Sequence, residues 1–135
     1  MIPTIVDSNV LLDVITGDST WTSWSSTALA SVATEAALVI NPLVYAEVSI
    51  RFDSIEELED ALPRSLLRRE DLPFNAGFLA GKAYLTYRNR GGRRRSLLPD
   101  FLIGAHAAIA GYRVLTRDPR RYRSYFPTVE LISPT

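Results

Sequence analysis

Short apolar runs alternate with longer amphipathic segments along the chain. Strands are predicted where the apolar residues are contiguous, at residues 3–7, 37–40, 114–116 and 129–132, with a further short strand at Leu66 and Leu67. Helices are predicted between them, at residues 8–15, 22–35, 42–52, 54–62, 75–89 and 100–110. This alternation is typical of an α/β domain in which a central, mostly parallel sheet carries helices on both faces, in three layers.

Residues with strong end preferences mark several of these boundaries. Gly17 ends the first helix, because glycine readily adopts the left-handed conformation found after helix ends. Asn41 and Pro42 form a cap and first-turn pair for the helix at 42–52. Ser54 and Glu57 have the spacing of a capping box. Helices are therefore expected directly after the first two strands.

Length and composition indicate one compact domain over residues 1–135. Nearly half of the residues, 47%, are apolar, which is enough for a substantial core. The chain has no cysteine and a single histidine, His106, so disulfides, thiolate metal sites and histidine-rich zinc sites are excluded. No apolar run approaches the roughly 20 residues that span a bilayer, and no basic flank precedes the first strand. We expect a cytoplasmic protein without membrane contact.

The net charge of zero conceals a strongly basic C-terminal part. Between residues 88 and 123 the only acids are Asp100 and Asp118, whereas the arginines number ten: Arg88, Arg90, Arg93, Arg94, Arg95, Arg113, Arg117, Arg120, Arg121 and Arg123. A basic surface around an acidic centre suits a polyanion whose phosphates are drawn in. The loop at residues 90–96 is a candidate substrate clamp, with Arg93, Arg94 and Arg95 holding phosphates. For any one arginine, a solvated surface position is the simpler interpretation.

Four carboxylates stand where they would converge at one end of the predicted sheet. Asp7 and Asp118 follow strands, Asp100 opens a helix, and Glu47 lies in the helix after the strand at 37–40. Ligands of open α/β sheets bind beyond the carboxyl ends of the strands. Oxygen ligands with open positions suit magnesium, which polarises a phosphodiester and activates water. The hypothesis is a metal site in which Asp7 and Asp100 hold the main ion, Glu47 supports it, and Asp118 completes the site or binds a second ion.

Each acid also has a purely structural interpretation. Asp7 would cap the following helix, and Asp100 would favour the dipole of its own helix. Glu47 would pair with Arg51 one helical turn later, and Asp118, which precedes a proline, would open a turn. Four independent explanations at one sheet edge are less economical than one shared site, so the shared site is favoured.

Four segments resemble those of PIN-domain proteins and, more narrowly, VapC-type toxins. They are Ile5-Val6-Asp7-Ser8-Asn9-Val10-Leu11-Leu12-Asp13, Asn41-Pro42-Leu43-Val44-Tyr45-Ala46-Glu47, Leu98-Pro99-Asp100-Phe101-Leu102-Ile103-Gly104-Ala105-His106-Ala107 and Leu115-Thr116-Arg117-Asp118-Pro119. The resemblance implies a PIN-like α/β/α fold and an endoribonuclease that depends on Mg²⁺ or Mn²⁺ and cleaves tRNA or ribosomal RNA. It also implies a cognate antitoxin as partner and a homodimer.

The resemblance also assigns roles to individual residues. Asp7, Glu47, Asp100 and Asp118 match the family's acidic positions, and Ser8, Asn9 and Thr116 match neighbouring polar positions that help to hold metal or water. Asp13 is interpreted as a surface acid and His106 as structural. Residues 53–92 match weakly, which leaves substrate choice and dimer contacts open.

Two alternatives to a nuclease are considered. The first is a non-catalytic PIN-like module that binds nucleic acid or protein. The second is a phosphate-accepting receiver domain, which is disfavoured because the sole lysine, Lys82, sits in a predicted helix and not after a strand near the acids.

Overall fold

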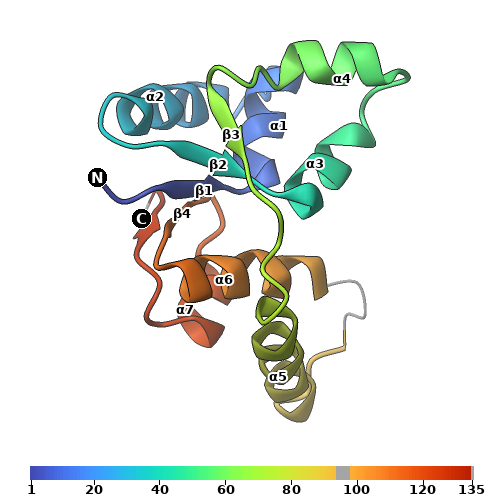
Figure 1. Ribbon diagram of the computed structural model, residues 1–135, viewed down its shortest axis with the longest axis vertical. Helices are drawn as coiled ribbons and strands as arrows, with labels where there is room; N and C mark the ends of the chain where they lie inside the picture. The colour runs from blue at the N-terminus through green and yellow to red at the C-terminus, as the bar shows by residue number, and fades with distance from the viewer. Residues whose placement is uncertain (94–97, 135) are drawn as a thin grey trace.

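The computed structural model describes residues 1–93 and 98–134 (Figure 1). Its elements, in chain order, are β1 (Thr4–Val6), α1 (Ser8–Thr16), α2 (Thr22–Ala33), β2 (Leu38–Ile40), α3 (Pro42–Ser49), α4 (Ile55–Ala61), β3 (Leu67–Arg69), α5 (Ala76–Asn89), α6 (Leu98–Ala110), β4 (Arg113–Leu115), α7 (Arg120–Tyr125) and β5 (Leu131–Ile132). None of the helices in the described ranges combines the length and apolarity needed to cross a bilayer.

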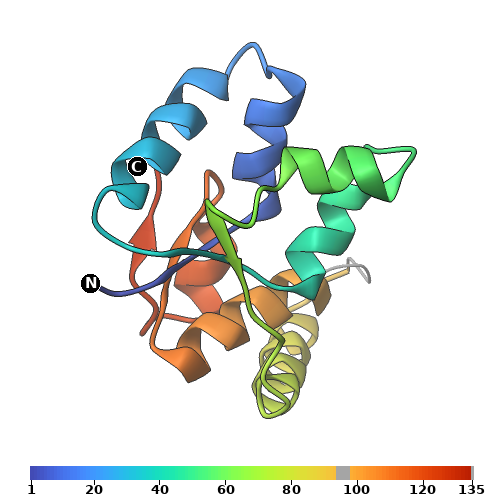
Figure 2. The ribbon, with the colours of Figure 1, turned by 45° about the horizontal axis from the view of Figure 1, so that its top comes forward.

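The strands form one sheet in the order β3-β2-β1-β4-β5, and every neighbouring pair is parallel. The chain moves outward from β1 to β2 and β3, and then returns to the other side of β1 to add β4 and β5. Since parallel crossovers are right-handed, this reversal sends the two sets of helices to opposite faces. Figure 1 and Figure 2 show α1 and α2 on one face, with α6 and α7 on the other and α5 beside α6. The predicted three-layer α/β/α fold is confirmed.

The reversal of strand order between β1 and β4 opens a crevice at their carboxyl ends. There α1 leaves β1 toward one face, while the segment after β4 leads to α7 on the other face, and ligands of such sheets bind at this position. The register pairs Val6 with Leu115, and the Asp7 N–H donates to the Leu115 carbonyl at 2.9 Å. Asp7 and Thr116 therefore emerge side by side.

An aromatic cluster joins the helices on the lower face of Figure 1. The Phe101 ring of α6 lies 5.3 to 6.2 Å, between ring centres, from the rings of Tyr84 and Tyr87 on α5, Tyr125 on α7 and Phe126 just after it. Phe101 itself is completely buried. Tilted and edge-on ring pairs of this kind are favourable beyond the area they bury. They attach α5 and α7 to α6, the helix that carries Asp100.

The predicted elements are confirmed with small shifts in their ends, apart from one omission. The short strand predicted at Leu66 and Leu67 is β3, at Leu67–Arg69, and the predicted helix at 42–52 ends at Ser49. The helix predicted from Asp100 begins at Leu98. The omission is α7, whose six residues are too few and too basic to show an apolar period. The Asp-Pro pair before it is a start signal that would have located it.

Gly104 is required where α6 meets the ring of Phe126. A β-carbon at Gly104 would lie 2.4 Å from that ring. Alanine ordinarily favours a helix over glycine by up to about 1 kcal/mol, but crowding in a packed core costs about 1–3 kcal/mol.

We therefore expect Gly104→Ala to lower the free energy of unfolding, measured by urea denaturation. In a Phe126→Leu background the same change should cost less, and equal costs in both backgrounds would rule out crowding as the cause.

Candidate functional site

Asp7 is the central carboxylate of the crevice. It occupies the position before α1, yet its side chain makes no capping hydrogen bond, so the capping interpretation is not what the structure shows. Its Oδ2 accepts hydrogen bonds from the Tyr122 hydroxyl at 2.9 Å, the Thr116 hydroxyl at 2.9 Å and the Asn9 amide at 3.4 Å. The side chain is held from three directions through a single oxygen.

The environment of Asp7 favours its neutral form over a bare charge. Burial raises the pKa of the Asp7 carboxyl, the hydrogen bonds from Tyr122 and Thr116 lower it, and the charge of Asp100 raises it again; the net direction is upward. Asp7 is only 7% exposed. Because its donors do not compensate for lost hydration, a cation beside Asp7 would lower the energy of the ionised form.

Glu47 and Ser8 form the next part of the site. The Ser8 hydroxyl donates to Glu47 Oε1 at 3.1 Å, which links α1 to α3. Burial raises the pKa of Glu47, the Ser8 hydrogen bond opposes this, and the charges of Asp7 and Asp100 raise it further. Among the described residues no ion pair joins Glu47 to Arg51. Asp7, Glu47 and Asp100 therefore form one set of mutually repelling acids.

Asp100 and Asp118 border the same pocket, each in contact with an arginine of α7. Asp100 Oδ2 accepts from Arg121 Nη1 at 3.1 Å, and the exposed Asp118 Oδ1 lies 3.4 Å from Arg120 Nε. The pocket has a volume of about 200 Å³ and is lined by Asp7, Ser8, Asn9, Asp100, Asp118, Arg121, Tyr122 and Phe126. The structure thus places three of the four predicted acids in the lining of one pocket, and the charges of two of them, Asp7 and Asp100, act on Glu47.

The donor set of this pocket fits a hard divalent cation. Its ligand atoms would be carboxylate oxygens, which Mg²⁺ prefers, and several waters would complete the coordination. Within residues 1–93 and 98–134, no three acidic or histidine side chains stand in a ready-made metal cage. Asp100 and Asp118 instead lie against arginines. A cation in this pocket would therefore compete with those arginines for the two carboxylates.

Asp13 is buried, contrary to the prediction of a surface acid. It is 2% exposed, and both of its oxygens accept from Arg117 Nε, at 3.1 and 2.9 Å. The Ser25 hydroxyl donates to it at 2.7 Å. The sequence interpretation failed because Arg117 is remote along the chain and reaches α1 only through the sheet. The Arg117 N–H also donates to the Asn9 side chain at 3.3 Å, so this pair fixes the segment between β4 and Asp118.

Tyr122 is the site residue that the sequence did not single out. Its buried hydroxyl donates to Asp7, a contact between residues far apart in the chain. Burial, followed by the charges of Asp7 and Asp100, raises the pKa of Tyr122 well above its ordinary value. The phenol therefore remains a proton donor toward Asp7 at any physiological pH.

His106 has a structural position, as its helical location indicated. It is buried, and its Nδ1 lies 3.0 Å from the Asn41 amide nitrogen, an arrangement that makes Nδ1 the acceptor. Burial lowers the pKa of His106, with Glu70 opposing. A neutral imidazole that holds the cap of α3 contributes no acid chemistry to the pocket.

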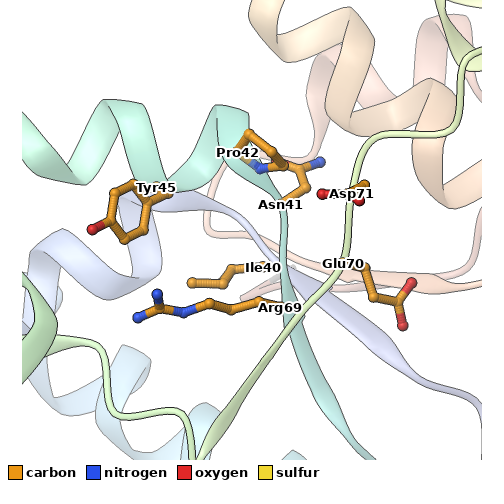
Figure 3. A pocket seen from close by; sticks show the side chains of 7 residues that line it. All are labelled: Ile40, Asn41, Pro42, Tyr45, Arg69, Glu70 and Asp71. Carbon is orange, nitrogen blue, oxygen red and sulfur yellow. The ribbon is translucent and has the colours of Figure 1, made fainter.

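A larger hollow beyond β2 and β3 is less suited to chemistry. It has a volume of about 300 Å³ and is lined by Ile40, Asn41, Pro42, Tyr45, Arg69, Glu70 and Asp71 (Figure 3). Arg69 is paired with Glu59 at 2.9 Å, and Glu70 with Arg68 at 2.7 Å. Figure 3 shows Arg69 beside Tyr45 and Glu70 directed away from both. Since these charges already neutralise one another, the smaller acidic pocket is the better candidate.

Basic and aromatic side chains border the acidic pocket. A hollow of about 300 Å³ shares Asp118 and Arg121 with it and is otherwise lined by Tyr87, Arg120, Ser124 and Tyr125. Arg90 lies over the Tyr125 ring at 5.3 Å, and Arg93 is exposed. Arg94 and Arg95, predicted to hold phosphates, lie outside the described residues. The structure adds Arg120 and Arg121 to the cations near the acids.

Known proteins share this architecture. The sequence profile of the PIN domain family matches residues 4–126. Among solved structures, VapBC2 from Rickettsia felis bound to a DNA fragment from its promoter has a similar chain, with a TM-score of 0.76 and 17% identity over 99% of this chain and 100% of that one. VapBC-1 from nontypeable Haemophilus influenzae gives 0.74 and 14% over 98% of both chains. A toxin-antitoxin complex from Klebsiella pneumoniae gives 0.70 and 18% over 98% of both. No curated protein matches the chain significantly.

The burial of Asp7 makes a prediction for the metal-free protein. In Asp7→Asn the amide oxygen would keep the bonds from Tyr122 and Thr116 without a buried charge. We expect the free energy of unfolding in EDTA at pH 7 to rise by about 1–3 kcal/mol, the cost of leaving a buried polar group uncompensated. Urea denaturation measures it, with the exposed Asp118→Asn as a control of little effect.

Asp7→Asn should lose its gain in stability over the wild-type protein at lower pH. Because the folded pKa of Asp7 is raised, the wild-type protein gains stability as pH falls through that pKa and loses it as pH rises through it. The difference between Asp7→Asn and wild type should therefore shrink as the pH falls from 7 toward 3.8, the ordinary pKa of the carboxyl. A variant that is less stable than wild type, or an advantage independent of pH, would contradict this account of Asp7.

Proposed function

Since this chain belongs to the PIN domain family, we propose that it is a metal-dependent endoribonuclease that acts as a VapC-type toxin. It would hydrolyse phosphodiester bonds of tRNA or ribosomal RNA in the cytoplasm and be neutralised by a cognate antitoxin. The observation that carries the proposal is the convergence of Asp7, Glu47 and Asp100. Three mutually repelling carboxylates, of which Asp7 and Asp100 line one pocket, are costly to maintain without a bound cation.

We assign the ion, Mg²⁺ or Mn²⁺, to Asp7 and Asp100, with Asp118 completing its ligands. Such an ion polarises a phosphodiester and lowers the pKa of a bound water. Tyr122 and Thr116 orient Asp7 by donating to Oδ2, and the Asn9 amide supports the same oxygen. Ser8 positions Glu47, whose carboxylate would take up the proton of the attacking water.

The basic hollow beside the acids would bind the RNA. Arg120, Arg121 and Arg93 supply phosphate contacts, and Tyr125 offers a ring for a base. Arg94 and Arg95 are proposed to join them from the adjoining loop. Because Asp118 and Arg121 line both hollows, a strand bound along the basic hollow would lead directly to the acids.

The similar toxin-antitoxin complex supports an antitoxin partner, and one apolar groove suits it. The groove lies between α3 and α4, has a volume of about 290 Å³ and includes Tyr45, Phe52, Ile55 and Leu58. Asp53 lines it, and α4 carries further exposed acids, namely Glu56, Glu57 and Asp60. This charge pattern fits an amphipathic, basic segment of an antitoxin.

A second apolar surface, along α5, suits a second copy of the chain. Phe78 and Leu85 are 73% and 50% exposed, and their spacing of seven residues places them on one side of the helix. Phe74, in the turn before α5, is fully exposed and extends the apolar surface. Large exposed apolar stripes mark interfaces, and a twofold axis would pack this stripe against itself.

Cleavage of RNA tests the proposed activity. Protein purified free of partner should cut total RNA into discrete fragments with Mg²⁺ and none with EDTA, as resolved by gel electrophoresis. Asp7→Asn should reduce cleavage by at least about a thousandfold, the scale on which loss of central electrostatic stabilisation acts. Asp60→Asn, an exposed acid on α4, is the matched control and should retain full activity.

Two outcomes would overturn the assignment. Full activity in a folded Asp7→Asn protein would remove Asp7 from the site. RNA binding without metal-dependent cleavage would favour the alternative, a non-catalytic PIN-like binding module.

The α5 stripe makes a separate prediction. Light scattering should show wild-type protein as a dimer, and Phe74→Ser with Phe78→Ser as a monomer with an unchanged circular dichroism spectrum. Ile50→Ser, which removes a side chain that is 81% exposed at the end of α3, is the control and should leave the dimer intact. A dimer that persists in the double variant would place the interface elsewhere.

A further inference from the structure

Arg121 lies between the acidic pocket and the basic hollow. Its Nη1 donates to Asp100 Oδ2 at 3.1 Å, and the side chains are 28% and 32% exposed. Arg121 lines the acidic pocket on one side and the basic hollow on the other. Its neighbour Arg120 differs, since it is 89% exposed and lies 3.4 Å from Asp118 at the surface.

The contact with Asp100 places Arg121 in competition with a cation that would bind the same carboxylate. Asp100 adds to the repulsion felt by both Asp7 and Glu47, and a guanidinium on its Oδ2 offsets part of that repulsion. A metal that takes Asp100 Oδ2 as its ligand competes with this guanidinium, because both would bind the same carboxylate oxygen. The metal and Arg121 are thus competitors for one side chain.

A displaced Arg121 has a second binding partner within reach. The guanidinium presents a planar fork of donors that matches phosphate as well as carboxylate. Since α7 holds its base between the two hollows, rotation of the side chain alone would move the guanidinium from Asp100 to the basic hollow. A phosphate there would lie beside the acids.

We propose that Arg121 is an exchangeable internal counter-ion: it occupies Asp100 in competition with the metal and, once displaced, binds a phosphate of the RNA. The inference rests on the proposed metal site. It makes Arg121 a substrate-positioning residue that couples metal binding to RNA binding. It also predicts that removal of the Arg121 guanidinium strengthens metal binding and weakens RNA binding.

Calorimetric titration with Mn²⁺ at fixed ionic strength tests the competition. Arg121→Gln should bind Mn²⁺ about two- to fivefold more tightly than wild type, the worth of one partly exposed ion pair. Arg123→Gln removes the same charge from the same helix, at an exposed residue that lines neither hollow and donates to Ser133, and should change the affinity by less than about twofold. Equal tightening in both variants would show a general effect of charge and overturn the proposal.

RNA cleavage at saturating Mn²⁺ tests the second role. Arg121→Gln should raise KM about fivefold or more while it tightens Mn²⁺ binding, and Arg121→Lys, which keeps the charge without the fork, should recover part of the loss. An unchanged KM would overturn the phosphate contact. Thermal unfolding of each variant excludes a loss of fold, and Arg121→Lys provides the comparison if Arg121→Gln is unstable.

Different Mn²⁺-binding results would contradict the proposed metal site and the counter-ion proposal. If wild type and Asp7→Asn both leave Mn²⁺ unbound, the metal site itself is wrong. If wild type binds Mn²⁺, Asp7→Asn does not, and Arg121→Gln behaves like Arg123→Gln, the metal site stands and only the counter-ion proposal falls.

Discussion

The site depends on one buried carboxylate held at the seam between β1 and β4. Parallel pairing of Val6 with Leu115 brings Asp7 and Thr116 together, and their hydroxyl-to-carboxylate bond closes the seam. Tyr122 completes the support from α7. These donors fix the carboxylate but leave its pKa raised, because hydroxyl groups replace only part of the lost hydration. Geometry and residual electrostatic cost together prepare the pocket for a cation.

Arginines of the last third of the chain neutralise this acidic centre from outside. Arg117 binds Asp13 beneath the site, Arg121 binds Asp100 beside it, and Arg120 approaches Asp118 at the surface. The protein thus has no net charge although its site is acidic and its surroundings are basic. This distribution attracts a polyanion toward a position where a cation is also favoured, which is the electrostatic requirement for phosphodiester chemistry.

Much of the fold followed from local patterns, and the failures have physical causes. The helix ends at Gly17, Asn41 and Ser54 were readable because capping is a local hydrogen-bond or backbone preference. Helix α7 was missed because its stability comes from the packing of Tyr122 and Tyr125 on other elements, which no six-residue window contains. Asp13 was misplaced because the partner that stabilises its burial, Arg117, is 104 residues away.

The sequence by itself determined the α/β class, the carboxyl-end placement of the acids and their candidacy for a metal, since strand period, capping and ligand chemistry are properties of neighbouring residues. Only the tertiary structure decided the strand order, the pocket that Asp7 shares with Asp100 and Asp118, the donor role of Tyr122, and the contact of Arg121 with Asp100. These features join residues far apart in the chain. Their energies depend on burial and distance, which exist only once the sheet has assembled and its helices have packed against it.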